Sequence, residues 1–306
     1  MRLVVHGQQA FGASVLDALL KRGDNVVAVF CGPDKGPKPD PLKEAAQKAG
    51  LPLHQPKSYK TPEALEQFKA LNADLCLMAY VTLFVPSAVL NAPRLGSIQY
   101  HPSLLPLHRG PSSINWPIVQ GATKTGLTIF WPDDGLDTGP VLMQKTVDIG
   151  PDDTIGKVYF DKLFPLGVEA MLESLDLVKA GKAPRLVQDE TKATYESWCK
   201  PDNARIDWFK TVHQTYDLIR GCDPAPAAWT VLDGKKVQLF DCRKIVDRRG
   251  TMRGNAGEVA EIDADGFTVM GVGGAIRVGR VKPEDGAKQK AGDWAKIALK
   301  PGTRFS

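Results

Sequence analysis

The first 80 residues alternate between short apolar runs and segments with apolar residues at helical spacing, and this alternation constrains the fold more than any other feature. The apolar runs have the length and the β-branched content of buried strands. Strands that alternate with helices form a mostly parallel sheet with helices on both faces, so the pattern predicts a Rossmann-like α/β fold. The expected strands are 3–6, 25–31, 51–54 and 73–79, and the expected helices are 10–22, 42–49 and one that begins after Thr61, with Pro62 at its first position.

The pattern changes in the last third of the chain. A long helix is expected over 154–180, and a short strand over 206–208 and a helix over 212–221 follow it. Short alternating strands with frequent turns fill the rest of the chain, which is typical of a small β-barrel. We therefore expect two domains, 1–202 and 203–306. The expected buried stripe of the long helix is Val158, Leu163, Leu166, Met171, Leu175 and Val178.

The composition is that of a globular protein with a sizeable core. Of its 306 residues 43% are hydrophobic and 24% are charged, and no apolar run approaches the roughly 18 residues of a membrane span. The N-terminal residues have no pattern of a signal peptide. The five cysteines are scattered without paired spacing, which speaks against disulfides and against a zinc site. We therefore expect a cytoplasmic protein with no metal and no membrane partner.

The turn over 7–12, between the first strand and the first helix, has some glycine but no nucleotide-binding motif. It matches neither the dinucleotide fingerprint nor a phosphate loop. It still places a helix N-terminus beside the sheet, where a phosphate or a carboxylate is favoured.

His101 and Asp137 stand close to the ends of two further predicted strands, 96–100 and 126–131. Pro102 disfavours helical backbone at His101, so the imidazole is expected on extended or loop backbone. In open α/β sheets ligands collect at the carboxyl ends of strands, which favours a built site that contains this pair. Taken alone, the two segments also fit a structural histidine and a turn aspartate.

Several runs of residues around this pair form a recognisable pattern. The runs are Tyr100–Pro106, Ser113–Trp116, Thr128–Trp131, Asp133–Gly139, Gly181–Arg185 and Ile219–Trp229. They resemble the 10-formyltetrahydrofolate-dependent formyltransferase superfamily, and the resemblance covers essentially the whole chain. The hydrolase domain of 10-formyltetrahydrofolate dehydrogenase is the most similar member, and methionyl-tRNA formyltransferase is also similar. The resemblance therefore implies a formyltransferase-type domain over 1–202 that binds 10-formyltetrahydrofolate, followed by a small open, OB-like β-barrel over 203–306.

The resemblance implies an enzyme that removes the formyl group from N10 of 10-formyltetrahydrofolate through a tetrahedral intermediate. The formyl group would pass to water or to an acceptor, and His101 would act with Asp137, which orients the nucleophile and tunes the histidine. Transferases of this family usually carry Asn two residues before the histidine, whereas this chain carries Gln99. His101 and the Gln99 amide are the expected oxyanion donors, and the departure from Asn favours the hydrolase-like branch.

The folate ring needs an apolar slot lined by backbone donors and acceptors. Residues 80–86 and 131–136 are the expected walls of this slot. Ordinary core and loop packing is the alternative interpretation of these segments. The expected folate-binding residues are Tyr80, Val81, Phe84, Val85, Pro86, Trp131, Asp133, Asp134, Gly135 and Leu136. Ser103 and Arg109 are the expected substrate-binding residues; Arg109 would meet an anionic group of the substrate, or it is a surface residue.

The acceptor stays open between water, methionyl-tRNA and an amino sugar, and a folate-binding regulatory module without turnover is a further alternative. Residues 203–306 contain 18 Lys and Arg against 13 Asp and Glu, a mild excess that a tRNA could use and that a solvent-exposed face explains equally well. The loop over 32–41 lacks the long basic insertion that the resemblance associates with tRNA-binding members. A folate as the small-molecule substrate is expected first, and tRNA second. The basic candidates for tRNA are Arg243, Lys244, Arg248, Arg249 and Arg253.

Overall fold

The structure, a computed structural model, describes residues 1–34 and 36–306 and divides into two compact units. Lys35, in the loop predicted over 32–41, lies outside the described residues. Unit 1 contains Met1–Gly110, Gly126–Val147 and Asp161–Tyr195, and unit 2 contains Pro111–Thr125, Asp148–Phe160 and Glu196–Ser306. The units therefore do not divide the chain at one point, and the boundary at 202/203 stays a prediction.

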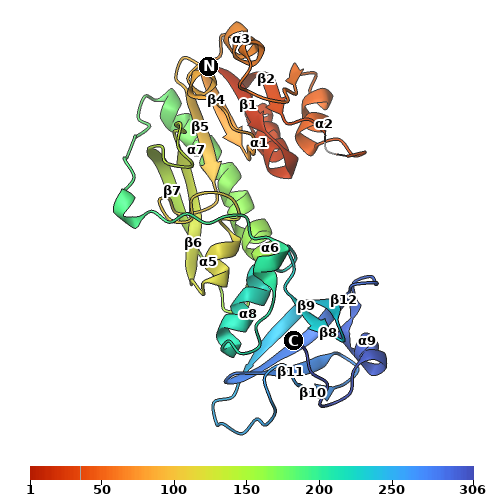
Figure 1. The fold of residues 1–306 in the computed structure, drawn as a ribbon. Helices are drawn as coiled ribbons and strands as arrows, with labels where there is room; N and C mark the ends of the chain where they lie inside the picture. Colours follow the sequence, from red (N-terminus) through yellow and green to blue (C-terminus); the bar gives the residue numbers. More distant parts are fainter. Residues whose placement is uncertain (35) are drawn as a thin grey trace. The chain divides into compact units, whose positions relative to one another are not determined.

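Unit 1 is built on a seven-stranded sheet with the order β3-β2-β1-β4-β5-β6-β7 (Figure 1). The strands β3, β2, β1, β4 and β5 are parallel, and β6 runs antiparallel to β5. The mostly parallel sheet of the expected α/β fold is thus confirmed. Its strands are β1 Arg2–Gly7, β2 Asn25–Cys31, β3 Leu53–His54, β4 Leu75–Ala79, β5 Ser97–His101, β6 Lys124–Phe130 and β7 Val141–Asp148.

Helices cover both faces of this sheet. On one face α1 packs against β5 and α7: the ring of Phe11 lies 4.3 Å from that of Tyr100 and 5.4 Å from that of Phe164. On the other face an apolar cluster joins β1, β2 and β4 to α3 and α4, and Phe30 stacks on Phe68 at 4.0 Å. The helices of unit 1 are α1 Gln9–Lys21, α2 Pro41–Lys48, α3 Pro62–Ala70, α4 Ser87–Leu90 and α7 Phe164–Lys179, whereas α5 Asn115–Val119 and α6 Ile155–Lys157 belong to unit 2.

The elements predicted for the first 80 residues are confirmed. At most of their ends the observed residue lies within one or two positions of the predicted one. Thr61 caps α3 by accepting a hydrogen bond from the amide of Ala64, as the Thr-Pro pair predicts. The helix predicted over 154–180 is interrupted by a π-helical turn, Val158–Leu163, and Leu166 is only half-buried beyond it. The extra residue in a π turn rotates the following stripe, which sequence periodicity does not reveal.

A carboxylate of the chain itself occupies the N-terminus of α1. The amide of Gln9 donates to both carboxylate oxygens of Asp40, at 2.8 and 2.9 Å. Gly7 before it is required by close packing, because a Cβ there would lie 2.1 Å from the carbonyl oxygen of Ala79 in β4. The anion predicted for this helix end is therefore supplied by Asp40.

Unit 2 contains a six-stranded antiparallel sheet with the order β10-β11-β12-β9-β8, to which β13 adds beside β12. The sheet curls around a core that includes Trp208, Phe267 and residues of α8, and this half-barrel confirms the expected open barrel. The strand predicted over 206–208 is wrong, because only Arg205 makes an isolated bridge there. Its elements are α8 Val212–Gly221, β8 Trp229–Leu232, β9 Lys235–Val246, β10 Val259–Ile262, β11 Phe267–Gly271, β12 Gly274–Pro283, β13 Gln289–Lys290 and α9 Ala291–Ala298.

Within 1–34 and 36–306, no helix combines the length and the apolar character needed to cross a membrane. Cys31 and Cys76 are buried in β2 and β4, as their apolar surroundings predict.

Candidate active site

His101 is the last residue of β5 and is almost completely buried, with 6% of its surface exposed. Side chains alternate along a strand, so Gln99 and His101 share one face of β5 while Tyr100 packs on the opposite face against Phe11. The Nε2 atom of His101 lies 2.9 Å from the carbonyl oxygen of His108. A carbonyl oxygen can only accept, so this contact places a hydrogen on Nε2 and leaves Nδ1 as the variable atom.

Asp137 is buried in the loop between β6 and β7, and its carboxylate faces His101. Its Oδ2 lies 3.6 Å from Nδ1 of His101 and accepts a hydrogen bond of 2.8 Å from the amide of Gly110. Its backbone has a φ of 56°, in the left-handed region that few residues other than glycine adopt. Residues in such conformations collect at functional sites, because the surrounding structure must hold them there.

His101 and Asp137 can therefore transfer a proton without the help of a further side chain. An imidazole with Nε2 fixed as a donor can take a proton at Nδ1, and the carboxylate 3.6 Å away then faces a cation. The His108 carbonyl at the other nitrogen stabilises the same cation. This is the arrangement of a general base whose orientation is set from two sides.

Gln99 lies two residues before His101 and is half-buried on the same face of β5. In the part of the chain that the structure describes, its amide has no hydrogen-bond partner. An amide that is anchored on a strand and free at its tip can donate to an oxyanion beside the histidine.

The two expected folate walls are joined by a hydrogen bond from the hydroxyl of Ser87 to the carboxylate of Asp134. Three large apolar side chains of these walls are exposed: Tyr80 at 44%, Phe84 at 57% and Leu136 at 57%. Asp133, in contrast, binds within its own loop, to the amide of Gly135 and the hydroxyl of Thr138. Val85 is buried in the apolar cluster of this face, and Val81 and Pro86 are half-buried.

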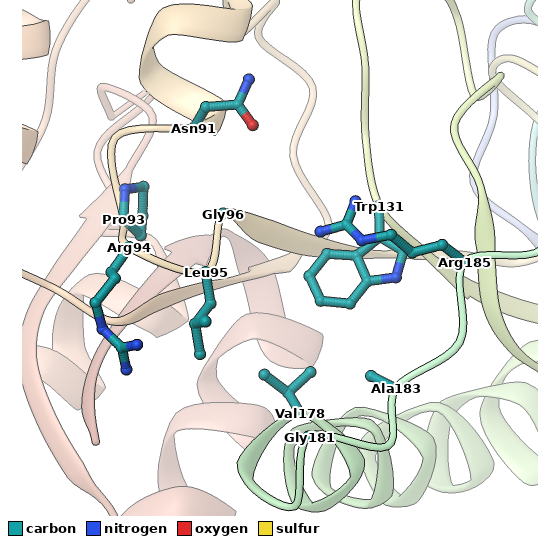
Figure 2. A pocket seen from close by; sticks show the side chains of 10 residues that line it. All are labelled: Asn91, Pro93, Arg94, Leu95, Gly96, Trp131, Val178, Gly181, Ala183 and Arg185. Carbon is teal, nitrogen blue, oxygen red and sulfur yellow. The ribbon is translucent and has the colours of Figure 1, made fainter.

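Trp131, the first residue of the second expected wall, lines a cavity. The cavity, of about 490 Å³, lies beside the loop that precedes β5, and Figure 2 shows the indole there with the guanidinium of Arg185 above it, 3.8 Å from the ring centre. The indole Nε1 donates to the carbonyl oxygen of Pro184 at 2.9 Å. None of the other expected folate-binding residues lines this cavity.

Ser103 and Arg109 are both buried and bound within the chain. The hydroxyl of Ser103 donates to the carbonyl oxygen of Leu107 at 2.6 Å. Arg109 has no exposed surface and makes a two-pronged ion pair with Glu190, at 2.6 and 2.9 Å. This pair raises the pKa of Arg109 and lowers the pKa of Glu190. The interpretation of Arg109 as a surface residue is therefore wrong.

A segment that the sequence did not single out lies against both site residues. We call residues 186–195 the strap. Gln188 in the strap donates from Nε2 to the carbonyl oxygens of Asp137 and Gly139, at 2.9 and 2.7 Å, and Thr194 accepts a hydrogen bond of 2.7 Å from the amide of His108. The strap has one short 3₁₀ turn and no periodicity, so only the resemblance of the preceding run Gly181–Arg185 could have drawn attention to it.

In the described ranges no group of three or more His, Cys, Asp and Glu side chains is arranged for a metal ion.

Two family models match this chain. The model of formyl transferase matches residues 1–175, which include every residue of the candidate site up to Asp137. The chain belongs to the formyl transferase family. A second model, that of the formyl transferase C-terminal domain, matches residues 199–299, so both parts of the chain match models of the family.

Curated relatives of two kinds are similar to this chain. The cytosolic 10-formyltetrahydrofolate dehydrogenase of Xenopus laevis is 44% identical over 245 residues, which are 78% of this chain and 27% of that protein. This chain thus spans about a quarter of the length of the dehydrogenases that it matches. The methionyl-tRNA formyltransferase of Geobacter metallireducens is 34% identical over 312 residues, which are 100% of this chain and 98% of that protein.

Solved structures share the fold at low identity. HypX from Aquifex aeolicus, in complex with tetrahydrofolic acid, has a TM-score of 0.71 at 17% identity and covers 98% of this chain and 48% of its own. The sugar 3N-formyl transferase WlaRD has a TM-score of 0.69 at 16% identity and covers 94% of this chain and 99% of its own. At these identities the likeness concerns the fold alone.

Proposed function

We propose that this chain removes the formyl group from N10 of 10-formyltetrahydrofolate, with water as the acceptor, in the cytoplasm. The observation that carries the proposal is the contact of His101 with Asp137, at 3.6 Å, at the exit of β5. It is supported by the 44% identity to a cytosolic 10-formyltetrahydrofolate dehydrogenase over 78% of the chain. Gln99 in place of the transferase Asn further favours water over an amine.

The residues of the site suit a formyl group held beside β5. Tyr80, Phe84 and Leu136 offer exposed apolar surface for a pteridine ring, and backbone groups of the joined loops offer donors and acceptors. Trp131 is left out of this proposed slot, because its indole belongs to the other cavity. Arg109 and Ser103 are left out because their polar atoms bind within the chain.

In the proposed reaction Nδ1 of His101 takes a proton from the attacking water. Asp137 stabilises the imidazolium, and the His108 carbonyl keeps the ring oriented through Nε2. The Gln99 amide donates to the oxygen on which negative charge develops. His101 then returns its proton to the departing nitrogen, and formate and tetrahydrofolate leave.

The test is the release of formate from 10-formyltetrahydrofolate by the purified chain without any amine. We expect His101→Asn and Asp137→Asn each to lower this rate by at least about 100-fold, since acid–base catalysis contributes about 10²–10⁴-fold. The matched control is His213→Asn, an exposed histidine of α8, which should leave the rate unchanged. All three variants should still bind tetrahydrofolate, as measured by the quenching of the protein's fluorescence. A site variant that keeps more than about a tenth of the rate would refute the acid–base assignment.

A second candidate function is formylation of methionyl-tRNA, because the relative of that name matches this chain from end to end. Two of the basic residues proposed to contact tRNA, Arg243 and Lys244, lie near the end of β9, and three follow it. All except the half-buried Lys244 are exposed. We expect only weak tRNA binding, with a Kd no tighter than about 10⁻⁶ M at physiological salt. Formylation of methionyl-tRNA at that salt, lost when Arg243, Lys244, Arg248, Arg249 and Arg253 are neutralised, would decide for this function. Turnover only with an amino-sugar nucleotide would decide for a sugar formyltransferase.

A further inference from the structure

The strap, residues 186–195, contacts the loop that carries Asp137 and the loop after β5, whose residue His108 contacts His101. Its first residue pairs with β7: the amide and carbonyl groups of Val141 and Leu186 exchange two hydrogen bonds, of 2.8 and 2.9 Å. Its far end pairs with the loop after β5, where the amide of Arg109 donates to the carbonyl oxygen of Thr194 at 2.9 Å. The strap is thus fastened to the exit of the Asp137 loop and to the His108 loop.

Gln188 is the link from the strap to Asp137. It is buried, with 6% of its surface exposed, and its Nε2 donates both hydrogens to the Asp137 loop. Its Oε1 accepts from Nε and Nη2 of Arg109, at 3.2 and 2.8 Å. Every hydrogen-bonding site of the amide is used, so the position of the Asp137 carbonyl is fixed against a fully buried guanidinium.

Arg109 in turn is held by Glu190 of the same strap and by the hydroxyl of Tyr195. Planar two-pronged pairs of this kind fix orientation as well as position. The residue after Arg109 is Gly110, whose amide donates to the Asp137 carboxylate. The same network therefore fixes the positions of both the carbonyl and the carboxylate of Asp137, the residue with left-handed backbone.

Thr194 is the link from the strap to His101. Its Oγ1 accepts from the amide of His108, and its own amide donates to the carbonyl oxygen of Pro106 at 3.1 Å. These contacts fix the His108 peptide, whose carbonyl oxygen accepts from Nε2 of His101. The left-handed backbone of His108, with a φ of 57°, depends on the same support.

We propose that the strap is the positioning element of the site. Gln188 holds Asp137 in position, and Thr194 holds His101 in position through His108. The inference rests on the proposed function for its catalytic meaning but not for its geometry. Partners behind reacting groups hold them in productive positions, and a displacement of 1 Å can cost about 100-fold in rate. Gln188 and Thr194 are positioning residues, because neither side chain is placed against the formyl group.

The experiment uses two conservative changes in the whole chain. Gln188→Glu keeps the size and the acceptor for Arg109 but replaces both donors to the Asp137 loop, and Thr194→Val keeps the size but removes the acceptor for His108. We expect each to lower kcat for formate release by at least about tenfold while KM changes little, since orientation and not affinity is lost. Thr194→Ser retains the hydroxyl and should restore wild-type kcat. Gln55→Glu, which alters an amide that donates to the carbonyl of Gly32, is the matched control and should change neither constant.

Hydrogen exchange gives a second readout that does not depend on activity. In Gln188→Glu the amide of Gly110 and the amides of residues 133–139 should exchange faster, while the rest of unit 1 keeps its protection. If the wild-type chain releases no formate, the proposed function fails and the exchange result still decides whether the strap holds the loop. Unchanged exchange in this loop, or an equal loss of kcat in Thr194→Ser and Thr194→Val, would overturn the inference.

Discussion

His6, near the end of β1, is a buried histidine outside the candidate site, and it should make the stability of the chain depend on pH. It is 3% exposed, its ring lies 4.7 Å from that of Tyr59, and burial lowers its pKa from 6.5 to about 3. Between these two values the unfolded chain binds the proton and the folded chain does not, so stability falls as the pH decreases below 6.5. From pH 7 to pH 5 the expected loss is about 2 kcal/mol in the free energy of unfolding. We expect His6→Phe, which suits the neighbouring rings of Phe30 and Tyr59, to remove this part of the pH dependence. Urea unfolding at pH 7 and at pH 5 measures the free energy of unfolding of both proteins. An equal loss of this free energy in wild type and variant would contradict the assignment.

At the scale of elements, the sequence predicted the parts of unit 1 that follow local periodicity and missed those held by distant contacts. The strands and helices up to β4 could be predicted because their apolar patterns are regular, and His101 and Asp137 because they stand at strand ends. The strand β7 and the strap could not, since β7 alternates only weakly and the strap is ordered by hydrogen bonds to residues far along the chain. The loop between β6 and β7 shows how such contacts can be tested. A Cβ at Gly139 would lie 1.8 Å from the carbonyl oxygen of Trp131, so Gly139→Ala must displace the loop that carries Asp137. We expect a loss of at least about tenfold in kcat and of about 1–3 kcal/mol in stability, as for other overpacked sites. Gly271→Ala in β11, where the nearest atom is 3.8 Å away, should change neither quantity. Wild-type kcat in Gly139→Ala would show that the loop adapts without moving the carboxylate.

At the scale of the whole molecule, the boundary expected at 202/203 would separate segments that belong to one compact unit. Residues 111–125 and 148–160 lie in unit 2 together with α8. The amide of Asn115 in α5 donates to the carbonyl oxygens of Gly221 and Ala225, at 2.8 and 3.2 Å, and the hydroxyl of Tyr216 in α8 donates to Asp152 at 2.9 Å. A fragment that ends at residue 202 would lose all of these partners, and the side of α5 that α8 covers, including Val119, would meet water. Apolar surface released in this way binds hydrophobic dyes and promotes aggregation. We therefore expect the 1–202 fragment to bind such a dye strongly and to unfold without a sharp thermal transition, whereas the whole chain binds little dye and unfolds cooperatively. The contrary outcome is a fragment that is monodisperse, unfolds sharply and binds tetrahydrofolate as the whole chain does. It would place an independent domain boundary at 202/203, because the first 202 residues would then need nothing from α8 to complete their core.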